Sequence, residues 1–451
     1  MPNKVTAALW YVYLCLQTFV SLTVVGEAVQ SIRPNVLARR ARRKAAVEGF
    51  PELNERTCPP IDVVLVAYLP NEKDIILRQM RYVLRELDYP ISRLNINIVY
   101  NTPKPIEPLE TQMKEMEAQY PNLKVIKVPK STSKADNINH FLTLPSESKI
   151  IAIFDTDHYP SRQALKWVAR RFNQGDVDII QGRCCIYNFD ETWVTRLIAA
   201  EFDTIYGVFH PGRANLHGFG LFGGSNGYWN ASLLRSIGMQ KHMLTEDIDS
   251  TIRAITSGAR IAYDLKVISY ETAPDTLAAL LKQRLRWAQG WTQVSIRHFG
   301  PAMRRGAYGS YVRSRLGLFF LLAFREVSFP LPLSSALSCP VADFLAPIIQ
   351  TGLLLLPLPS LLPPLLLLPH PRPAVVDNAL QVVHRLQNLG LGARLQHSLH
   401  CDVHHYHRSE SLRFHKAIGD LPLWRHLARV LHHCHLVSFA TLLCLLVLTL
   451  S

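Results

Sequence analysis

The stretch KIIAIFDTD, residues 149–157, joins an apolar run to two carboxylates. A short apolar run of this kind is typical of a strand that is buried on both faces of a sheet. Asp155 and Asp157 follow it two residues apart, so both carboxylates can turn towards one metal ion. Hard oxygen ligands suit Mg²⁺ or Mn²⁺, and such an ion can hold a diphosphate. Aspartate is also common in loops, so this pair needs support from the rest of the chain.

Three similar runs precede this stretch and extend the pattern. They are IDVVLVAYL (61–69), LNINIVY (94–100) and LKVIKVP (123–129). After the first run, KDIILRQMRYVLREL carries apolar residues at helical spacing. Strands that alternate with helices predict an α/β domain over residues 57–275. Its sheet should be mostly parallel and should bind ligands at the carboxyl ends of the strands.

The first residues of the chain predict a membrane anchor. Residues 5–26 carry no charge, and their length suits a bilayer core of ~30 Å. They lack a small-residue cleavage site, which favours an anchor over a cleaved signal. The basic run RRARRK (39–44) follows, and positive charge after a first span predicts the cytoplasmic side. A solvated basic linker would explain the same charges.

Composition narrows the partners of the protein. The chain has 451 residues and a formal net charge of +14, which suits nucleic acid, an anionic membrane or an anionic substrate. No nucleic-acid-binding motif accompanies the charge, so nucleic acid is not expected as a partner. The eight cysteines form no C-x-x-C pair, which indicates reduced thiols rather than a disulfide framework.

The character of the chain changes after about residue 310. The runs 316–324 and 344–368 are candidate spans, although prolines at 357, 359, 363 and 364 interrupt the second. Twelve histidines fall at or after residue 370, and the clusters at 400–407 and 432–435 lack the spacing of a known metal site. We interpret this break as a reading frame shifted after roughly residue 330, which resequencing of the transcript across 320–380 would test.

The predicted organisation follows from these features. It comprises an N-terminal transmembrane helix (1–29), a basic cytoplasmic linker (30–56), the α/β domain (57–275), an interfacial helix (276–310), a transmembrane region (311–370) and an irregular tail with a terminal apolar segment (371–451).

Two polar segments lie further along the α/β domain. In LTEDID, Thr245, Glu246 and Asp247 could cap the following helix, or the aspartate could serve as a general base. The stretch GFGLFGGSNGYWN (218–230) holds five glycines beside aromatic residues. Such a stretch lets the backbone approach a ligand closely, and a plain cluster of turns is the alternative.

The segment QRLRWAQGW (283–291) packs two cations and two indoles into nine residues. The planar fork of Arg286 suits phosphate oxygens, and the Trp287 ring suits a sugar face. An amphipathic interfacial helix with snorkelling arginines would carry the same residues.

The order of these motifs resembles that of the processive family 2 glycosyltransferases, which include cellulose, hyaluronan and chitin synthases. The resemblance spans roughly residues 57–300 and rests mainly on T-E-D followed by Q-R-x-R-W. It implies a GT-A fold on the cytosolic face of a membrane. It also implies metal-dependent, inverting transfer of a sugar from a UDP-sugar to a growing polysaccharide. Such a displacement needs one base and no protein nucleophile.

The resemblance also implies roles for single residues. These are Asp155 and Asp157 for Mg²⁺ or Mn²⁺ and the diphosphate, Asp247 as general base, Glu72 and Lys134 for the nucleotide, Gln283 and Arg286 for the diphosphate, and Trp287, Phe222, Gly224 and Ser225 for the acceptor.

One departure from the family pattern concerns the second strand. Asn101 stands where many relatives carry an aspartate for the uridine or the metal, and Asp136 in KADNIN is a candidate replacement.

Two other functions stay open. One is a non-processive lipid glycosyltransferase of the ceramide glucosyltransferase type, and the other is an inactive membrane scaffold.

Overall fold

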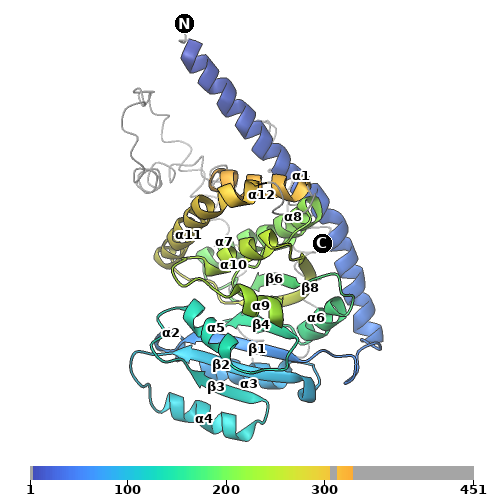
Figure 1. The fold of residues 1–451 in the computed structure, drawn as a ribbon, viewed down its shortest axis with the longest axis vertical. Coiled ribbons are helices and arrows are strands. Elements are labelled where there is room, and N and C mark those ends of the chain that lie inside the picture. The colour runs from blue at the N-terminus through green and yellow to red at the C-terminus, as the bar shows by residue number, and fades with distance from the viewer. Residues whose placement is uncertain (1–3, 305–311, 329–451) are drawn as a thin grey trace, which may run out of the picture. The chain divides into compact units, whose positions relative to one another are not determined.

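One eight-stranded sheet organises the chain in the computed structural model, which describes residues 4–304 and 312–328. Its strand order is β3-β2-β1-β4-β7-β6-β8-β5 (Figure 1). The strands are β1 (Ile61–Tyr68), β2 (Leu94–Asn101), β3 (Leu123–Lys127), β4 (Ile150–Asp155), β5 (Tyr159–Pro160), β6 (Ile179–Ile186), β7 (Gly227–Asn230) and β8 (Ile261–Glu271). The four predicted strands are therefore confirmed as β1 to β4, within two residues at each end.

The sheet is mixed, so the expectation of a mostly parallel sheet is only partly right. Strands β1 to β4 run parallel to their neighbours in that group, and β6 runs parallel to β8. The short strand β7 lies antiparallel between β4 and β6, and β5 is antiparallel to β8. Strand β7 comes from the glycine-rich stretch and has four residues, too few for a periodic pattern to identify it.

Helices cover both faces of this sheet. They are α1 (Lys4–Glu48), α2 (Leu69–Glu72), α3 (Ile76–Glu86), α4 (Leu109–Gln119), α5 (Lys134–Thr143), α6 (Ala164–Phe172), α7 (Trp193–Thr204), α8 (His210–His217), α9 (Ala231–Ile237), α10 (Glu246–Thr256), α11 (Leu277–Met303) and α12 (Val312–Ser328). A 3₁₀ turn, η1 (Ile91–Arg93), precedes β2, and a π-helical turn, η2 (Ile205–Phe209), links α7 to α8.

Strand β1 shows why the apolar runs are continuous. Its residues alternate between two cores, because successive side chains of a strand point to opposite faces. Val63 and Leu65 pack in the core that holds α3, α4 and α6. Val64 and Val66 pack in the core that holds α5, α9, α10 and α11. With both faces covered, no position of the strand interior needs a polar residue.

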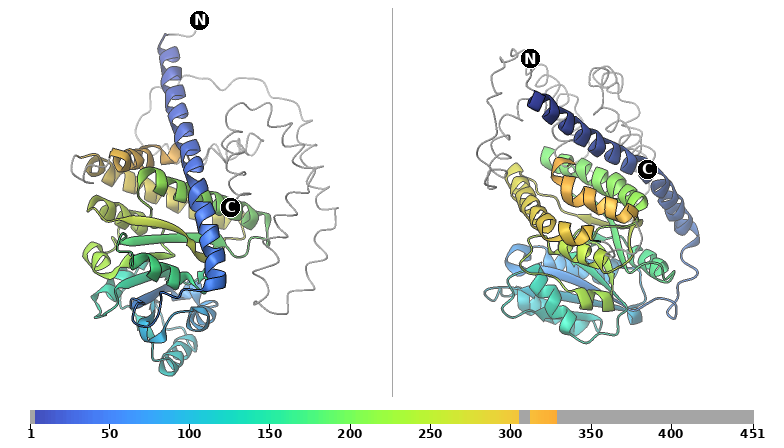
Figure 2. Two further views of the ribbon diagram at one scale, coloured as in Figure 1. Left: turned by 90° about the vertical axis from the view of Figure 1, so that its right-hand side faces the viewer. Right: turned by 45° about the horizontal axis from the view of Figure 1, so that its top comes forward.

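Helix α1 runs without a break from Lys4 to Glu48 and passes along α8 and α12 (Figures 1 and 2). It contains the predicted anchor and most of the predicted linker. Residues 30–48 are therefore helical and are not a free linker. The Asn35 amide donates to the Gly207 carbonyl at 2.7 Å, and Arg42 donates to the Leu265 carbonyl at 3.1 Å. These bonds attach the second half of α1 to the α/β domain.

A buried ion pair also joins α1 to α8. The Glu27 carboxylate, 1% exposed, accepts two bonds from the Arg213 guanidinium, at 2.8 and 3.1 Å. The two backbones approach closely at Gly212, where a Cβ atom would lie 1.8 Å from the Glu27 carbonyl oxygen. Only glycine fits this crossing, and the pair satisfies the charge that the contact buries.

Within residues 4–304 and 312–328, no helix combines the length and the apolar character that crossing a membrane requires. The predicted span at 316–324 lies in α12, where Leu318 and Leu321 are buried in the same core as α10 and α11. The remainder of the predicted transmembrane region, the tail and both histidine clusters lie outside the described residues.

Candidate active site

Lys134 joins three of the predicted motifs at the carboxyl ends of the central strands. It is the first residue of α5, after the N-cap Ser133, whose hydroxyl accepts from the Asp136 amide at 3.0 Å. Its ammonium lies 2.5 Å from Asp155 Oδ1 at the end of β4 and 2.8 Å from the Gly224 carbonyl oxygen. The lysine therefore connects the D-x-D pair to the glycine-rich stretch.

The glycine-rich stretch also contacts the T-E-D motif. Gly224 has φ +95°, and a Cβ atom there would lie 2.7 Å from Asp247 Oδ2. The next residue, Ser225, is buried, and its hydroxyl accepts from the Asp155 amide at 3.1 Å. Asp155, Gly224, Ser225 and Asp247 thus form one site, although they are far apart in sequence.

Burial and neighbouring carboxylates raise the pKa values of Glu72 and Asp157. Burial, together with Asp157 and Asp155, raises the pKa of Glu72 to about 7. Burial also raises the pKa of Asp157 to about 6, with a contribution from Asp155 and against the opposing effect of His158. By residue type these three carboxylates suit Mg²⁺ or Mn²⁺. In the described part of the chain, the group whose ligand atoms lie within 4.8 Å of one another is His158, Cys184 and Glu271.

The T-E-D motif lies at the start of α10. Burial raises the pKa of Glu246 to about 7, with a contribution from Asp247. Burial raises the pKa of Asp247 as well, although Lys134 opposes the shift. Thr245 occupies the predicted N-cap position of α10, but its hydroxyl makes no hydrogen bond to the helix. The hydroxyl is buried and has no partner among the described residues.

Helix α11 carries the QRLRW segment within the predicted interfacial range. Its N-cap is Thr276, which accepts from the Ala279 amide at 3.4 Å. At Gly290 a Cβ atom would lie 2.4 Å from Thr245 Cγ2, so α11 and the T-E-D motif are in close contact. Trp291 is 6% exposed and belongs to the core beneath this contact.

The predicted ligands of α11 differ in their surroundings. Gln283 Oε1 is buried and has no hydrogen-bond partner among the described residues. Arg286 is exposed and has no hydrogen bond or ion pair with any residue that the structure describes. Trp287 is half-buried and packs on a cluster of α7 and β6 side chains. A buried acceptor atom and an unpaired guanidinium are groups that a bound substrate would satisfy.

Phe222 does not present its ring to the site. The side chain is 1% exposed and packs edge-to-face on Trp229, with ring centroids 5.5 Å apart. Its amide donates to Thr251 Oγ1 at 3.2 Å, and its carbonyl accepts from the same hydroxyl at 3.3 Å. Phe222 therefore holds the glycine-rich stretch in place, whereas the resemblance implied contact with the acceptor.

Both the oxygen and the nitrogen of the Asn101 amide have partners inside the protein. Its oxygen accepts from Asn137 at 2.9 Å, and its nitrogen donates to the Ser131 carbonyl at 3.1 Å. The candidate replacement, Asp136, instead accepts from the amide and hydroxyl of Thr132, both at 3.1 Å. The residue of the KADN motif that contacts Asn101 is thus Asn137, which directly follows Asp136.

Sequence reasoning missed a buried group directly behind the D-x-D pair. His158 Nε2 lies 2.7 Å from Glu271 Oε2, and His158 Nδ1 lies 3.2 Å from the Ser269 hydroxyl. Ligand atoms of His158, Glu271 and Cys184 all lie within 4.8 Å of one another. Both ring nitrogens already have partners, so this group ties the D-x-D turn to the end of β8. The histidine that directly follows D-x-D in the sequence is the feature from which this group could have been predicted.

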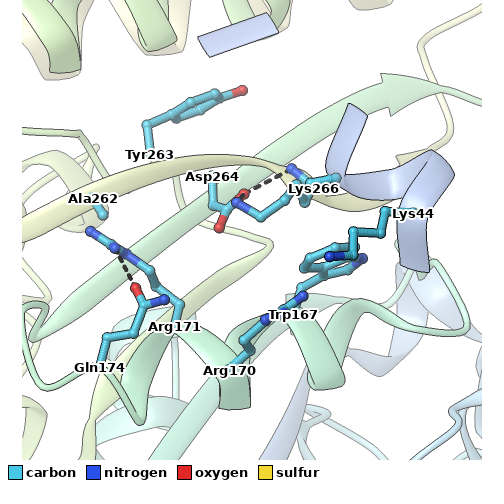
Figure 3. A pocket seen from close by; sticks show the side chains of 10 residues that line it. Lys44, Trp167, Arg170, Arg171, Gln174, Ala262, Tyr263, Asp264 and Lys266 are labelled. Atoms are coloured by element: carbon cyan, nitrogen blue, oxygen red, sulfur yellow. Dashed lines mark hydrogen bonds and ion pairs between the residues drawn. The ribbon is translucent and has the colours of Figure 1, made fainter. Parts of the chain in front are cut away.

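The basic segment of α1 contributes to a separate pocket of 460 Å³ between α1, α6 and β8 (Figure 3). Trp167 lines it together with Lys44, Lys266, Arg170 and Arg171. Each of these cations has a carboxylate partner, the pairs being Lys44–Glu48, Arg170–Glu52, Arg171–Asp176 and Lys266–Asp264. The pocket therefore offers no unpaired positive charge to an anionic ligand.

Two family profiles match the chain. The profile of glycosyl transferase family 2 matches residues 63–233, and that of glycosyl transferase family group 2 matches residues 150–368. Both include the D-x-D pair, and the second also includes the T-E-D and QRLRW motifs and continues past residue 330.

Curated relatives agree at low identity. The probable glycosyltransferase YdaM of Bacillus subtilis is 24% identical over 52% of this chain and 56% of its own. Putative cellulose synthase 2 of Komagataeibacter xylinus is 25% identical over 63% of this chain and 18% of its own. The β-monoglucosyldiacylglycerol synthase of Synechocystis is 27% identical over 55% and 52%. The chain spans about half the length of these relatives, or less.

Among solved structures, the mannosyltransferase PcManGT of Pyrobaculum calidifontis, in complex with GDP-Man and Mn²⁺, is 18% identical. The match covers 74% of this chain and 91% of that one, with a TM-score of 0.47. The two profiles and the relatives confirm the expectation at the level of family 2: residues 63–368 carry glycosyltransferase family 2 domains, and the mixed sheet is a GT-A-like fold.

Proposed function

We propose that this glycosyltransferase transfers a sugar from a UDP-sugar to a growing polysaccharide, with inversion at the anomeric carbon. One observation carries the proposal: Gly224 lies against Asp247 on one side and accepts from Lys134 on the other. The predicted base and the predicted diphosphate site are therefore adjacent, as a direct displacement requires.

The donor side would use the carboxylates and the cations of the site. Asp155, Asp157 and Glu72 would hold Mg²⁺ or Mn²⁺, which when bound offsets the negative charge of the leaving diphosphate. Lys134, which pairs with Asp155, and the exposed Arg286 would supply further positive charge to that group. Preorganised cations stabilise a leaving group most where water is largely excluded.

The acceptor side would use Asp247 as the base. Its Oδ1 atom accepts from the Ile248 amide at 2.8 Å, which leaves Oδ2 to take the proton of the attacking hydroxyl. A base is most effective when its pKa lies near the working pH, and burial raises the pKa of Asp247 in that direction. Trp287 would supply the flat apolar surface on which the acceptor sugar lies.

We also propose that the protein works at a membrane, with its catalytic domain on the cytoplasmic side. The uncharged residues 5–26 lie in the first half of α1, and RRARRK lies in the second half. Membrane lipid would then be a partner besides the UDP-sugar and the polysaccharide. Carbonate-washed membranes that release the full-length protein would contradict this location.

A lipid glycosyltransferase is the second candidate, because the relatives include a glycolipid synthase at 27% identity. Membranes that contain the protein should be incubated with each labelled UDP-sugar, with and without Mg²⁺ or Mn²⁺. Polymer that resists organic extraction supports the polysaccharide, whereas extractable product supports the glycolipid. Failure to transfer or hydrolyse any UDP-sugar would indicate the inactive scaffold. For variants of the QRLRW segment, the exposed Arg297 on the same helix, α11, provides a matched control, Arg297→Lys.

A further inference from the structure

Arg284 is the residue of the QRLRW segment that the proposed function leaves without a role. Its guanidinium lies 2.6 Å from Glu201 Oε2 of α7, and both side chains are largely buried. The guanidinium carbon also lies 4.1 Å from the centroid of the Trp287 ring. One planar cation thus pairs with a carboxylate and covers an indole at the same time, which suits arginine but not lysine.

A second polar contact joins the starts of α7 and α11. The Thr192 hydroxyl, at the N-cap of α7, donates to the Asp275 carbonyl just before α11 at 3.1 Å. Glu201 and Arg284 meet the same number of residues further along their helices. The two helices therefore run in the same direction, and the ion pair fixes their register one turn before Trp287.

Trp287 is consequently held from both sides along α11. One turn before it, Arg284 ties the helix to α7. One turn after it, Gly290 packs on Thr245, next to the acids of the T-E-D motif. Any change in the Arg284 contact would tilt the indole relative to the base, because the second contact stays in place.

We propose that Arg284, paired with Glu201, is a positioning residue that sets the plane of the Trp287 ring for the acceptor sugar. This inference rests on the proposed function, in which Trp287 contacts the acceptor. Arg284 itself touches neither the donor nor the reacting atoms. Arg284→Lys keeps the charge but loses the planar stack and the fixed fork.

Full-length protein in detergent should be assayed with UDP-glucose as donor and cellotetraose as acceptor. Arg284→Lys should raise the KM for cellotetraose on the order of tenfold, while the KM for UDP-glucose stays within about twofold. Glu201→Gln should act in the same direction, and Arg297→Lys should change neither constant. Equal changes in both constants, or no change in the acceptor KM, would overturn the proposal.

A double-mutant cycle separates this inference from the proposed function. If Arg284 acts through the indole, Arg284→Lys should have no further effect on the acceptor KM once Trp287→Ala is present. Independent, additive effects would refute the positioning role. If Trp287→Ala alone leaves the acceptor KM unchanged, the proposed acceptor site fails instead.

A spectroscopic measurement tests the position of the Trp287 ring even if a variant loses its activity for another reason. Arg284→Lys should change the near-UV circular dichroism of the protein, and the change should disappear in the Trp287→Ala background. An unchanged spectrum with native thermal stability would contradict the proposal even if no sugar is transferred.

Discussion

The ammonium of Lys134 lies 2.5 Å from Asp155 Oδ1 in the site of this glycosyltransferase, and its second bond reaches Gly224. Burial opposes the charge of Lys134, yet Asp155, Glu246 and Asp247 raise its pKa above the ordinary value. One cation therefore lies among acids from two separate motifs, D-x-D and T-E-D. A bound diphosphate would bring further negative charge close to the ammonium of this lysine.

Lys134→Gln should lower kcat on the order of 100- to 1000-fold, because a preorganised cation at the leaving group is lost. The variant should also bind UDP more weakly in isothermal titration calorimetry. Lys149→Gln, at an exposed lysine outside the site, is the control. A kcat within about twofold of the wild type would refute the role of Lys134.

Asp247→Asn should reduce transfer by about 100- to 10,000-fold while UDP binding is kept, because only the proton acceptor is removed. Its neighbour Glu246 shares the raised pKa but occupies the first helical position. Glu246→Gln should therefore be the milder change. Steady-state rates of the two variants decide the assignment, and the opposite order would make Glu246 the base.

Asp155→Asn should abolish the dependence of UDP affinity on Mg²⁺ or Mn²⁺, since one of the expected oxygen ligands is weakened. Calorimetric titration of UDP with the ion and with EDTA measures this dependence. A variant that still gains affinity on addition of the ion would place the metal elsewhere, and the group around His158 and Glu271 would then be the next to test.

Acid should destabilise the contact between α8 and α12 through His217. Burial and the Arg213 cation lower its pKa to about 4, while the nearby Glu27 carboxylate is already held by Arg213. Unfolded histidine titrates near pH 6.5 at roughly its model value, so the unfolded state binds more protons between about pH 6.5 and 4. Stability is therefore complete above this window and falls as the pH drops through it.

Thermal unfolding of the detergent-solubilised protein at about pH 7.5 and pH 5 tests this effect. His217→Gln should show a smaller loss of the unfolding temperature on acidification than the wild type. His242→Gln, at an exposed histidine, should keep the wild-type loss. Identical losses in all three proteins would contradict the role of His217.

Gly290→Val should destabilise the contact between α11 and the T-E-D motif by roughly 1–3 kcal/mol, because the new side chain overlaps Thr245. Thr245→Ala in the same protein should restore part of the stability and activity. The unfolding temperature and kcat of the single and double variants provide the measurement. Lack of any rescue would show that the clash lies elsewhere.

Local sequence predicted the strands of the site well, because both faces of β1 to β4 are covered and their apolar runs are therefore continuous. Local sequence did not predict an element that is very short, or the part of a helix that continues beyond its apolar run. Strand β7 has too few residues to show a period, and it turned a parallel sheet into a mixed one. Helix α1 continues through the basic run because Asn35 and Arg42 bind the domain.

The sequence by itself determined the family, the D-x-D, T-E-D and QRLRW motifs and the strands that end at the site, because these depend on residue type and local spacing. Only the tertiary structure decided which neighbour each side chain meets. It paired Asn101 with Asn137, buried the ring of Phe222 and gave Arg284 a partner on α7. Such pairings depend on how helices cross and where backbones approach, and no short range of sequence contains that information.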